Sequence, residues 1–124
     1  HKEYRLSGVA KGAGMIYPDM GTMFAFFSTD FPLPYEETKQ IFAEVLDSTF
    51  NAISVDGDTS TNDAALLLFK ERYESLTSEE KNIFSKALYF VAEKLALMIV
   101  EDGEGTTKVV HLKVEGENKE LCKK

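Results

Sequence analysis

The segment that begins at Thr77 places the strongest constraint on the fold of this chain. Thr77 and Glu80 have the spacing of a capping box, in which each side chain accepts a backbone N–H from the other residue at the start of a helix. Apolar residues then recur every three or four positions, as on the buried face of a helix: Phe84, Ala87, Leu88, Val91, Leu95 and Met98. The run "DGEG" (102–105) ends this pattern. The sequence therefore predicts a long amphipathic helix between Thr77 and this run.

A second helix is predicted from about Pro34 to Ala52. An apolar stripe again repeats at intervals of three and four residues: Ile41, Phe42, Val45, Leu46 and Phe50. Pro32 and Pro34 precede it, and proline cannot donate to a sheet ladder. The extended segment before these prolines must therefore end there.

Four segments have the character of strands. Residues 4–17 predict a short strand with a glycine-rich bend, and the aromatic-rich residues 22–29 predict a buried strand. The glycines of that bend are Gly8, Gly12 and Gly14. Residues 64–69 ("AALLLF") could be a strand or the start of a helix, and their short length favours a strand. In the last segment, apolar residues alternate with polar ones as in a half-exposed strand: Val110, Leu112 and Val114.

The predicted order is strand, strand, helix, strand, helix, strand. This order is typical of an α/β domain in which helices are layered on a sheet. The chain has 124 residues, which suits a single domain over 1–124.

Composition excludes several classes of partner. The net charge is −7 and no basic cluster stands out, so we expect no nucleic-acid partner. The longest apolar run, residues 64–69, is far too short to span a bilayer, and the first ten residues do not resemble a signal peptide, so no membrane partner is expected. Cys122 is the only cysteine, which excludes an internal disulfide and fits a reducing cytoplasm.

The polar loop "SVDGDTSTND" (54–63) leaves three interpretations open. An EF-hand that begins at Asp56 would need glycine at Thr61 and glutamate at Leu67, so it fails twice. A pair of aspartates after a strand could instead transfer phosphoryl groups, with Asp56 as nucleophile and Asp58 as acid. The third interpretation, a turn held by Asx and Ser/Thr hydrogen bonds, is favoured.

The acidic loop "EDGEGTTK" (101–108) follows the long helix predicted after Thr77. Its plainest interpretation is a helix stop, with Gly103 or Gly105 in a left-handed conformation. Alternatively, the glycines hold Glu104 where its carboxylate can meet a cationic substrate group. Spacing alone favours the stop. His111 has no metal-ligand partner in the sequence, so no zinc or haem site is predicted.

The stretch "KGAGMIYPDMGTMFAFFSTD" (11–30) also has two interpretations. Its glycines can serve turns, and Thr22 can be an ordinary strand residue. Alternatively Thr22 is a nucleophile, because cleavage of the Gly21–Thr22 bond would free an α-amine of pKa about 7.7–8.0 that can act as its base. Glycine at position 21 permits a strained backbone in which the hydroxyl attacks the preceding carbonyl. Lys11 could then place positive charge near a substrate carboxylate or an oxyanion.

Three segments together resemble one enzyme family. "KGAGMIYPDMGTMFAFFSTD", "VDGDTSTNDAALLLF" and "DGEGTTK" are similar, in order and spacing, to segments of the bifunctional ornithine acetyltransferase/N-acetylglutamate synthase of arginine biosynthesis. The resemblance runs over nearly the whole chain. It implies an αββα sandwich, of which this chain would hold some strands. It also implies a precursor that cuts itself before a threonine, which then carries the acetyl group.

The resemblance implies a role for four residues. Thr22 matches the nucleophile, and the Gly21–Thr22 bond matches the autocleavage site. Lys11 matches a substrate-contacting lysine, and Glu104 matches the substrate-contacting glutamate of the "DGEG" segment.

The family's enzymes extend further on both sides, so the resemblance identifies this chain as a central piece. Residues 1–21 would be the end of an α chain, and residues 22–124 the first half of a β chain. The family's oxyanion-hole threonine and glycine would precede the piece, and a substrate-binding asparagine and threonine would follow it. Four residues stand where the family more often has Ala, Asn, Ala and Leu: Tyr17, Asp19, Gly21 and Phe24.

Substrates and partners follow from the same resemblance. N-acetylornithine is the expected acetyl donor and glutamate the acceptor, with acetyl-CoA as a candidate second donor. No metal or organic cofactor is expected. We expect the α and β chains to associate in a cytoplasmic oligomer. The alternative is a folded piece without chemistry, because the oxyanion donors lie outside it.

Overall fold

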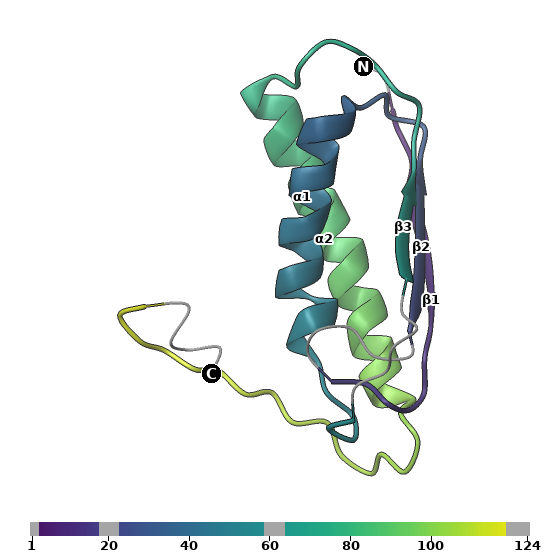
Figure 1. Cartoon of the computed structure of the whole chain (residues 1–124), viewed down its shortest axis with the longest axis vertical. Coiled ribbons are helices and arrows are strands. Elements are labelled where there is room, and N and C mark those ends of the chain that lie inside the picture. Colours follow the sequence, from purple (N-terminus) through teal and green to yellow (C-terminus); the bar gives the residue numbers. More distant parts are fainter. Residues whose placement is uncertain (1–2, 18–22, 59–63, 119–124) are drawn as a thin grey trace.

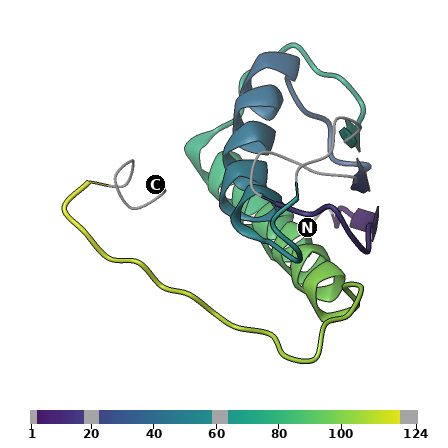
Figure 2. The same ribbon diagram turned by 60° about the horizontal axis from the view of Figure 1, so that its bottom comes forward.

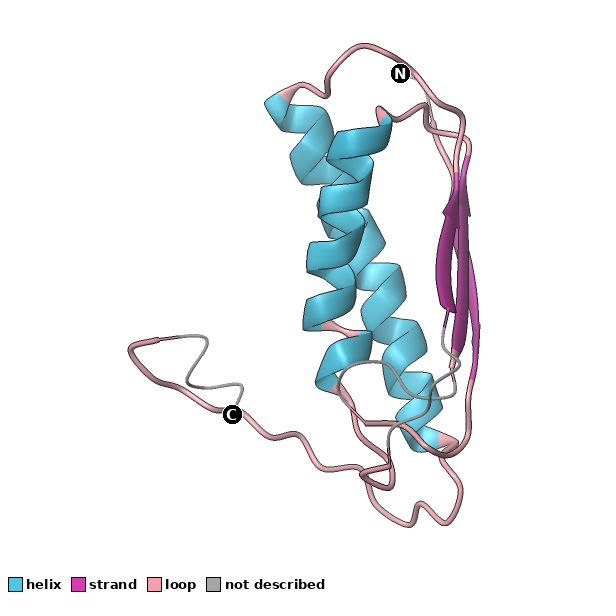
Figure 3. Cartoon of the chain, in the orientation of Figure 1, coloured by secondary structure: helices cyan, strands magenta, loops and turns pink. Residues whose placement is uncertain are grey.

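The computed structural model describes residues 3–17, 23–58 and 64–118 (Figure 1). Within these ranges the chain forms, in order, β1 (Leu6–Lys11), β2 (Phe24–Thr29), α1 (Tyr35–Ser48), the short 3-10 helix η1 (Phe50–Ala52), β3 (Ala64–Leu68) and α2 (Ser78–Glu101). Both long helices lie on one side of the sheet, which confirms the predicted α/β fold with helices layered on a sheet (Figure 3).

The central strand of the sheet is β2, in the order β1-β2-β3. Strand β1 runs antiparallel to it, with Lys11 opposite Phe24. Strand β3 runs parallel to it, with Ala64 opposite Phe24. A parallel neighbour requires a crossover connection, and α1 lies in the connection between β2 and β3. This topology brings the end of β1 and the starts of β2 and β3 to one end of the sheet.

Buried residues of the strands and of both helices form one core, and two views show the helices over the same face of the sheet (Figures 1 and 2). Alternate residues of β2 point into this core, and the rings of Phe42 and Phe50 pack edge-on against Phe27 at centroid distances of 5.7 and 6.2 Å. The predicted stripe of α1 is confirmed, since Ile41 and Val45 are buried. In the described part of the chain, neither helix is long and apolar enough to cross a membrane.

Gly8 marks a close approach of α2 to the sheet. It lies inside β1, not in the predicted bend. A Cβ atom at this position would lie 2.9 Å from Leu95 Cδ1 and 3.0 Å from both Phe27 Cδ1 and Val91 Cγ1. Side chains do not approach so closely, so the glycine lets the helix pack directly on the strand.

The buried face of α2 differs from the predicted stripe. Phe84 and Leu88 are buried as predicted, but Ala87 and Met98 are exposed. The buried line of the helix is Phe84, Leu88, Ala92, Ala96 and Ile99. The helix packs against both β1 and α1, so its buried face is set by two neighbours. Alanine at two central positions leaves room for both.

The start of α2 confirms the capping box. Thr77 Oγ1 accepts the Glu80 N–H at 3.2 Å, and the Glu80 carboxylate accepts the Thr77 N–H at 2.9 Å. The same carboxylate accepts two Arg72 N–H groups at 3.0 and 2.9 Å. The Arg72 guanidinium also lies 5.8 Å from the ring centre of Phe31. One arginine therefore ties the start of the helix to the segment that follows β2.

The pH dependence of stability should report this contact. The Arg72 guanidinium, with the Thr77 N–H next, lowers the pKa of Glu80 from 4.5 to about 2. A carboxyl group with a lowered folded-state pKa stabilises the fold fully above its unfolded value, and this contribution is lost as the pH falls from 4.5 toward about 2. We therefore expect the melting temperature of Glu80→Gln to lie below that of the wild type at neutral pH, and the gap to close across this interval. Thermal melts followed by circular dichroism measure it.

The neighbouring Glu79→Gln is the matched control, since it removes one charge from the first turn of α2 and keeps the Arg72 contact. A gap for Glu80→Gln that stays constant down to the acid end would contradict the role of the ionised carboxylate.

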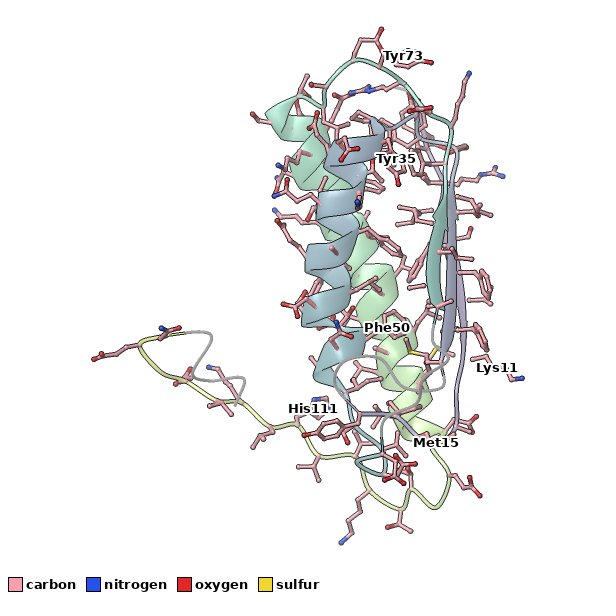
Figure 4. The ribbon with its side chains drawn as sticks, in the orientation of Figure 1. Lys11, Met15, Tyr35, Phe50, Tyr73 and His111 are labelled. Carbon is pink, nitrogen blue, oxygen red and sulfur yellow. The ribbon has the colours of Figure 1, made fainter. Side chains whose placement is uncertain are left out.

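The face of the sheet that points away from the helices is apolar and exposed. Its large exposed side chains are Val9, Phe24, Phe26, Leu66 and Leu68. They alternate with residues that face the core, so these strands carry apolar side chains on both faces. None of the described elements covers this surface, where side chains project freely (Figure 4). We call it the open face of the sheet.

The strand predicted around Val110 to Val114 is wrong. Residues 106–118 form no strand and lead away from the helices and the sheet (Figure 1). Val110 and Leu112 are 82% and 85% exposed. An alternating pattern shows that one side of a segment suits burial, but it supplies no partner strand. No described strand lies beside this segment, and His111 is exposed within it (Figure 4).

Candidate active site

Three strand ends meet at the lower end of the molecule in Figure 1. Strand β1 ends at Lys11, and Phe24 at the start of β2 pairs with both Lys11 and Ala64. The predicted cleavage site, Gly21–Thr22, lies outside the described residues. Met23, the next residue in the chain, is buried, and its carbonyl accepts the Ala64 N–H at 3.1 Å. Burial and this hydrogen bond therefore fix Met23, the described residue that follows the predicted nucleophile.

Asp56 holds the loop that follows Lys11. Its Oδ2 accepts the Met15 N–H at 2.6 Å, and its Oδ1 accepts the Ile16 N–H at 3.1 Å. In return the Val55 N–H donates to the Ile16 carbonyl at 2.8 Å. Loops about 40 residues apart in the sequence are joined in this way. The backbone N–H groups, that of Met15 first, lower the pKa of Asp56.

These contacts agree with the interpretation of the polar loop as a hydrogen-bonded turn, and they also join this turn to residues 15 and 16. Asp56 Oδ1 also accepts the Asp58 N–H at 3.2 Å, which closes an Asx turn. Asp58 takes part through its backbone. The phosphoryl-transfer hypothesis expected a strand before the two aspartates, but the element that precedes them is η1. Residues 59–63 of this loop lie outside the described ranges.

Glu104 is attached to the same loop from the other side. Its N–H donates to the Ala13 carbonyl at 2.7 Å. A Cβ atom at Gly14 would lie 3.4 Å from Asp56 Oδ2 and 3.5 Å from Glu104 Oε2, so both carboxylates flank this glycine. Gly105 has a φ of +73°, which confirms the left-handed stop after α2. The structure therefore brings Glu104 and Asp56 together at the end of the helix.

Lys11 lies at the same end but faces elsewhere. Its side chain is exposed and extends away from the helices into solvent (Figure 4). Neither of the ion pairs formed by the described residues includes it. Between residues 10–13 and the last turns of α2, a hollow of about 420 Å³ opens to solvent. The end of β1 thus borders a space large enough for a small molecule.

The hydrogen bonds between Asp56 and residues 15–16 could not be predicted from the sequence. Their donors are backbone N–H groups, which no residue type marks. The one available signal was Gly14, since glycine permits close approach of other groups to the backbone. Among the described residues, no group of three His, Cys, Asp or Glu side chains could hold a metal ion.

Comparison with known proteins identifies the family. The sequence profile described as "ArgJ family" matches residues 1–123. The chain belongs to the ArgJ family. This confirms the resemblance drawn from the three segments.

Two relatives show the extent of the similarity. A protein of Schizosaccharomyces japonicus named "Arginine biosynthesis bifunctional protein ArgJ, mitochondrial" is 43% identical over 117 residues, which cover 91% of this chain and 27% of the relative. A protein of Methanocaldococcus jannaschii named "Glutamate N-acetyltransferase" is 46% identical over 121 residues, which cover 93% of this chain and 29% of the relative. The chain therefore spans about three tenths of the curated relatives it matches.

A solved structure supports the fold. The crystal structure of "Arginine biosynthesis bifunctional protein argJ" from Bacillus halodurans superposes with a TM-score of 0.57 at 36% sequence identity. The match covers 68% of this chain and 41% of that chain. The described α/β arrangement is therefore that of part of an ArgJ-family protein.

Proposed function

We propose that this chain supplies the nucleophile and two substrate contacts for acetyl transfer from N-acetylornithine to glutamate. Thr22 is the nucleophile, freed by cleavage of the Gly21–Thr22 bond, and Lys11 and Glu104 contact the substrates. The observation that carries the proposal is that Lys11, the start of β2 and the loop of Glu104 meet at one end of a chain of this family.

Two covalent steps use the same hydroxyl group. In the precursor, Thr22 Oγ attacks the Gly21 carbonyl, the peptide bond becomes an ester, and water hydrolyses that ester to leave a Gly21 carboxylate and a free Thr22 amine. That amine, of pKa about 7.7–8.0, then accepts the hydroxyl proton. Thr22 Oγ bonds to the acetyl carbon of N-acetylornithine, and ornithine leaves with its nitrogen protonated. The amine of glutamate takes the acetyl group from the ester and regenerates the hydroxyl.

Charge complementarity supports the two substrate contacts. Ornithine carries a cationic side chain, and glutamate carries an anionic one. Of the two carboxylates beside Gly14, that of Asp56 is occupied by backbone N–H donors, whereas that of Glu104 accepts no hydrogen bond among the described residues. Glu104 and Lys11 are both exposed, so a charged substrate can reach them. An N-terminal threonine carries its own base, so the proposal needs no metal or organic cofactor.

The competing proposal is a folded piece without chemistry. It is favoured by coverage, since the chain spans 27% and 29% of two relatives and the family's oxyanion-hole residues are expected outside it. Loss of one oxyanion donor lowers a rate by about 10²–10³-fold. We therefore assign the complete activity to a full-length version, in which this chain is flanked by the residues that its relatives have and associates with them in an oligomer of α and β chains.

Intact-mass measurement with N-terminal sequencing tests the proposed function. We expect the full-length version to yield two pieces, the second of which begins at Thr22. The 124-residue chain should cleave incompletely or not at all, because surrounding groups that strain the bond are missing. A cut at any other bond in the full-length version would remove Thr22 from the role of nucleophile.

Lys11→Met and Glu104→Gln should impair substrate binding in the full-length version. Each loses a charge-assisted contact of about 1.5–3 kcal/mol, so the KM of the substrate contacted should rise about 10- to 100-fold. The melting temperature should change little, because both side chains are exposed. Steady-state kinetics with N-acetylornithine and glutamate measure the effect. Lys39→Met, at an exposed lysine on α1 outside the site, is the control. An unchanged KM in Glu104→Gln would leave Glu104 only its place in the helix stop.

A further inference from the structure

One side chain holds the backbone of the loop between Lys11 and the cleavage site. Within the described residues, the carboxylate of Asp56 is the only side-chain group that hydrogen-bonds residues 12–17, through the Met15 and Ile16 N–H groups. The same loop carries Ala13, whose carbonyl binds the Glu104 N–H at 2.7 Å. The loop therefore connects Asp56 to both proposed substrate contacts.

We propose that Asp56 is a positioning residue for the chemistry of Thr22. The inference rests on the proposed function. The loop held by Asp56 leaves β1 directly after Lys11, supports Glu104 at Ala13, and leads along the chain to the Gly21–Thr22 bond. By fixing Met15 and Ile16, the carboxylate fixes the spacing between Lys11 and Glu104 without touching the substrate.

The arrangement requires a carboxylate. Three N–H groups point at its two oxygens: Met15 at Oδ2, and Ile16 and Asp58 at Oδ1, at 2.6, 3.1 and 3.2 Å. Asparagine has the same shape, but one oxygen is replaced by an NH2 group, which is itself a donor. That group would face at least one of the three N–H donors. Asp56→Asn therefore keeps the size of the side chain and loses part of the attachment.

The backbone at Met15 makes this loss consequential. Met15 has a φ of +52°, a conformation that costs free energy for a residue with a side chain. Its N–H makes the shortest of the three bonds to Asp56. When that bond weakens, Met15 can return to an ordinary conformation, and Ala13 and the attached Glu104 move with it. A displacement of about 1 Å in a catalytic arrangement can lower a rate by about 10²-fold.

Asp56→Asn in the full-length version tests the inference, with two control variants. Asp58→Asn makes the same chemical change two residues later, at a residue that contributes its backbone N–H. Leu88→Ala destabilises the core through a fully buried side chain on α2, outside the site. The rate of self-cleavage, the kcat of acetyl transfer and the melting temperature are measured for each, with rates taken well below every melting temperature.

We expect Asp56→Asn to lower both the self-cleavage rate and kcat about 10- to 100-fold. The self-cleavage rate and the kcat of Asp58→Asn should stay within about twofold of the wild-type values, because substitutions of exposed residues usually have small effects. The melting temperature of Leu88→Ala should fall further than that of Asp56→Asn, whereas its self-cleavage rate and kcat should be unchanged. This pattern separates positioning from stability, because a structural role would order the variants by melting temperature.

Three results would overturn the inference: normal rates in Asp56→Asn, equal losses in Asp56→Asn and Asp58→Asn, or rate losses that follow melting temperature across the three variants. The proposed function is judged separately. If a chain that lacks the Thr22 hydroxyl still cleaves and transfers acetyl groups, Thr22 is not the nucleophile, whatever Asp56→Asn does. If only the Asp56 result fails, the nucleophile assignment stands.

Discussion

Thr22→Ala in a full-length version should remain a single uncut chain and should transfer acetyl groups at least about 10⁴-fold more slowly than the wild type, as hydrolases do when they lose their nucleophile. The reason is covalent. Both proposed steps pass through an ester on the Thr22 hydroxyl, and alanine cannot form one. Intact mass measures the first reaction, and transfer of a labelled acetyl group from N-acetylornithine to glutamate measures the second.

The matched control is Thr22→Ser, which keeps the hydroxyl and removes one methyl group. It should still cut the chain and transfer acetyl groups. If Thr22→Ala were cut at the same bond, the peptide would be opened by an external nucleophile or a protease. Normal transfer in Thr22→Ala would move the chemistry to another residue.

Leu88→Ala should strongly destabilise the fold. Leu88 is fully buried at 0% exposure in the line of α2 that faces β1 and α1. Removing its side-chain atoms loses apolar burial and leaves a cavity, which together cost about 2–5 kcal/mol. Urea denaturation should show a lower midpoint at an unchanged slope.

Met98→Ala is the informative control for this prediction. Met98 belongs to the stripe predicted from the sequence, yet it is 59% exposed. Its truncation should change the free energy of unfolding by no more than about 0.5 kcal/mol. Equal losses at the two positions would mean that the predicted stripe, with Met98 in it, describes the buried face better than the structure does.

The elements that the sequence predicted well are those whose signals are local. The capping box at Thr77 needs only residues three positions apart, and the apolar stripe of α1 needs only the periodicity of a helix. The last predicted strand failed for the opposite reason. Residues 110–114 alternate between apolar and polar side chains, but a strand exists only beside another strand, and the alternation says nothing about the neighbour.

The same distinction between local and distant signals applies to the candidate site. Lys11, Thr22 and Glu104 could be proposed from the sequence because their residue types suit the chemistry and the surrounding segments resemble a family. The Asp56 attachment could not, because its partners are backbone N–H groups some 40 residues away.

The open face of the sheet bears on how this chain can be prepared and redesigned. Contiguous exposed apolar surface lowers the solubility of an isolated domain, and exposed strands invite pairing between molecules. Val9, Leu66 and Leu68 are 62%, 50% and 66% exposed, so polar substitutions there would remove less buried surface than substitutions in the core. Threonine keeps the β-branched preference for strands, and a lysine on β1 or β3 would discourage edge pairing. The two helices cover one side of the three-stranded sheet, and the open face is the side that would pack on a second sheet in an αββα sandwich. Polar substitutions there therefore suit the isolated chain and not the full-length version.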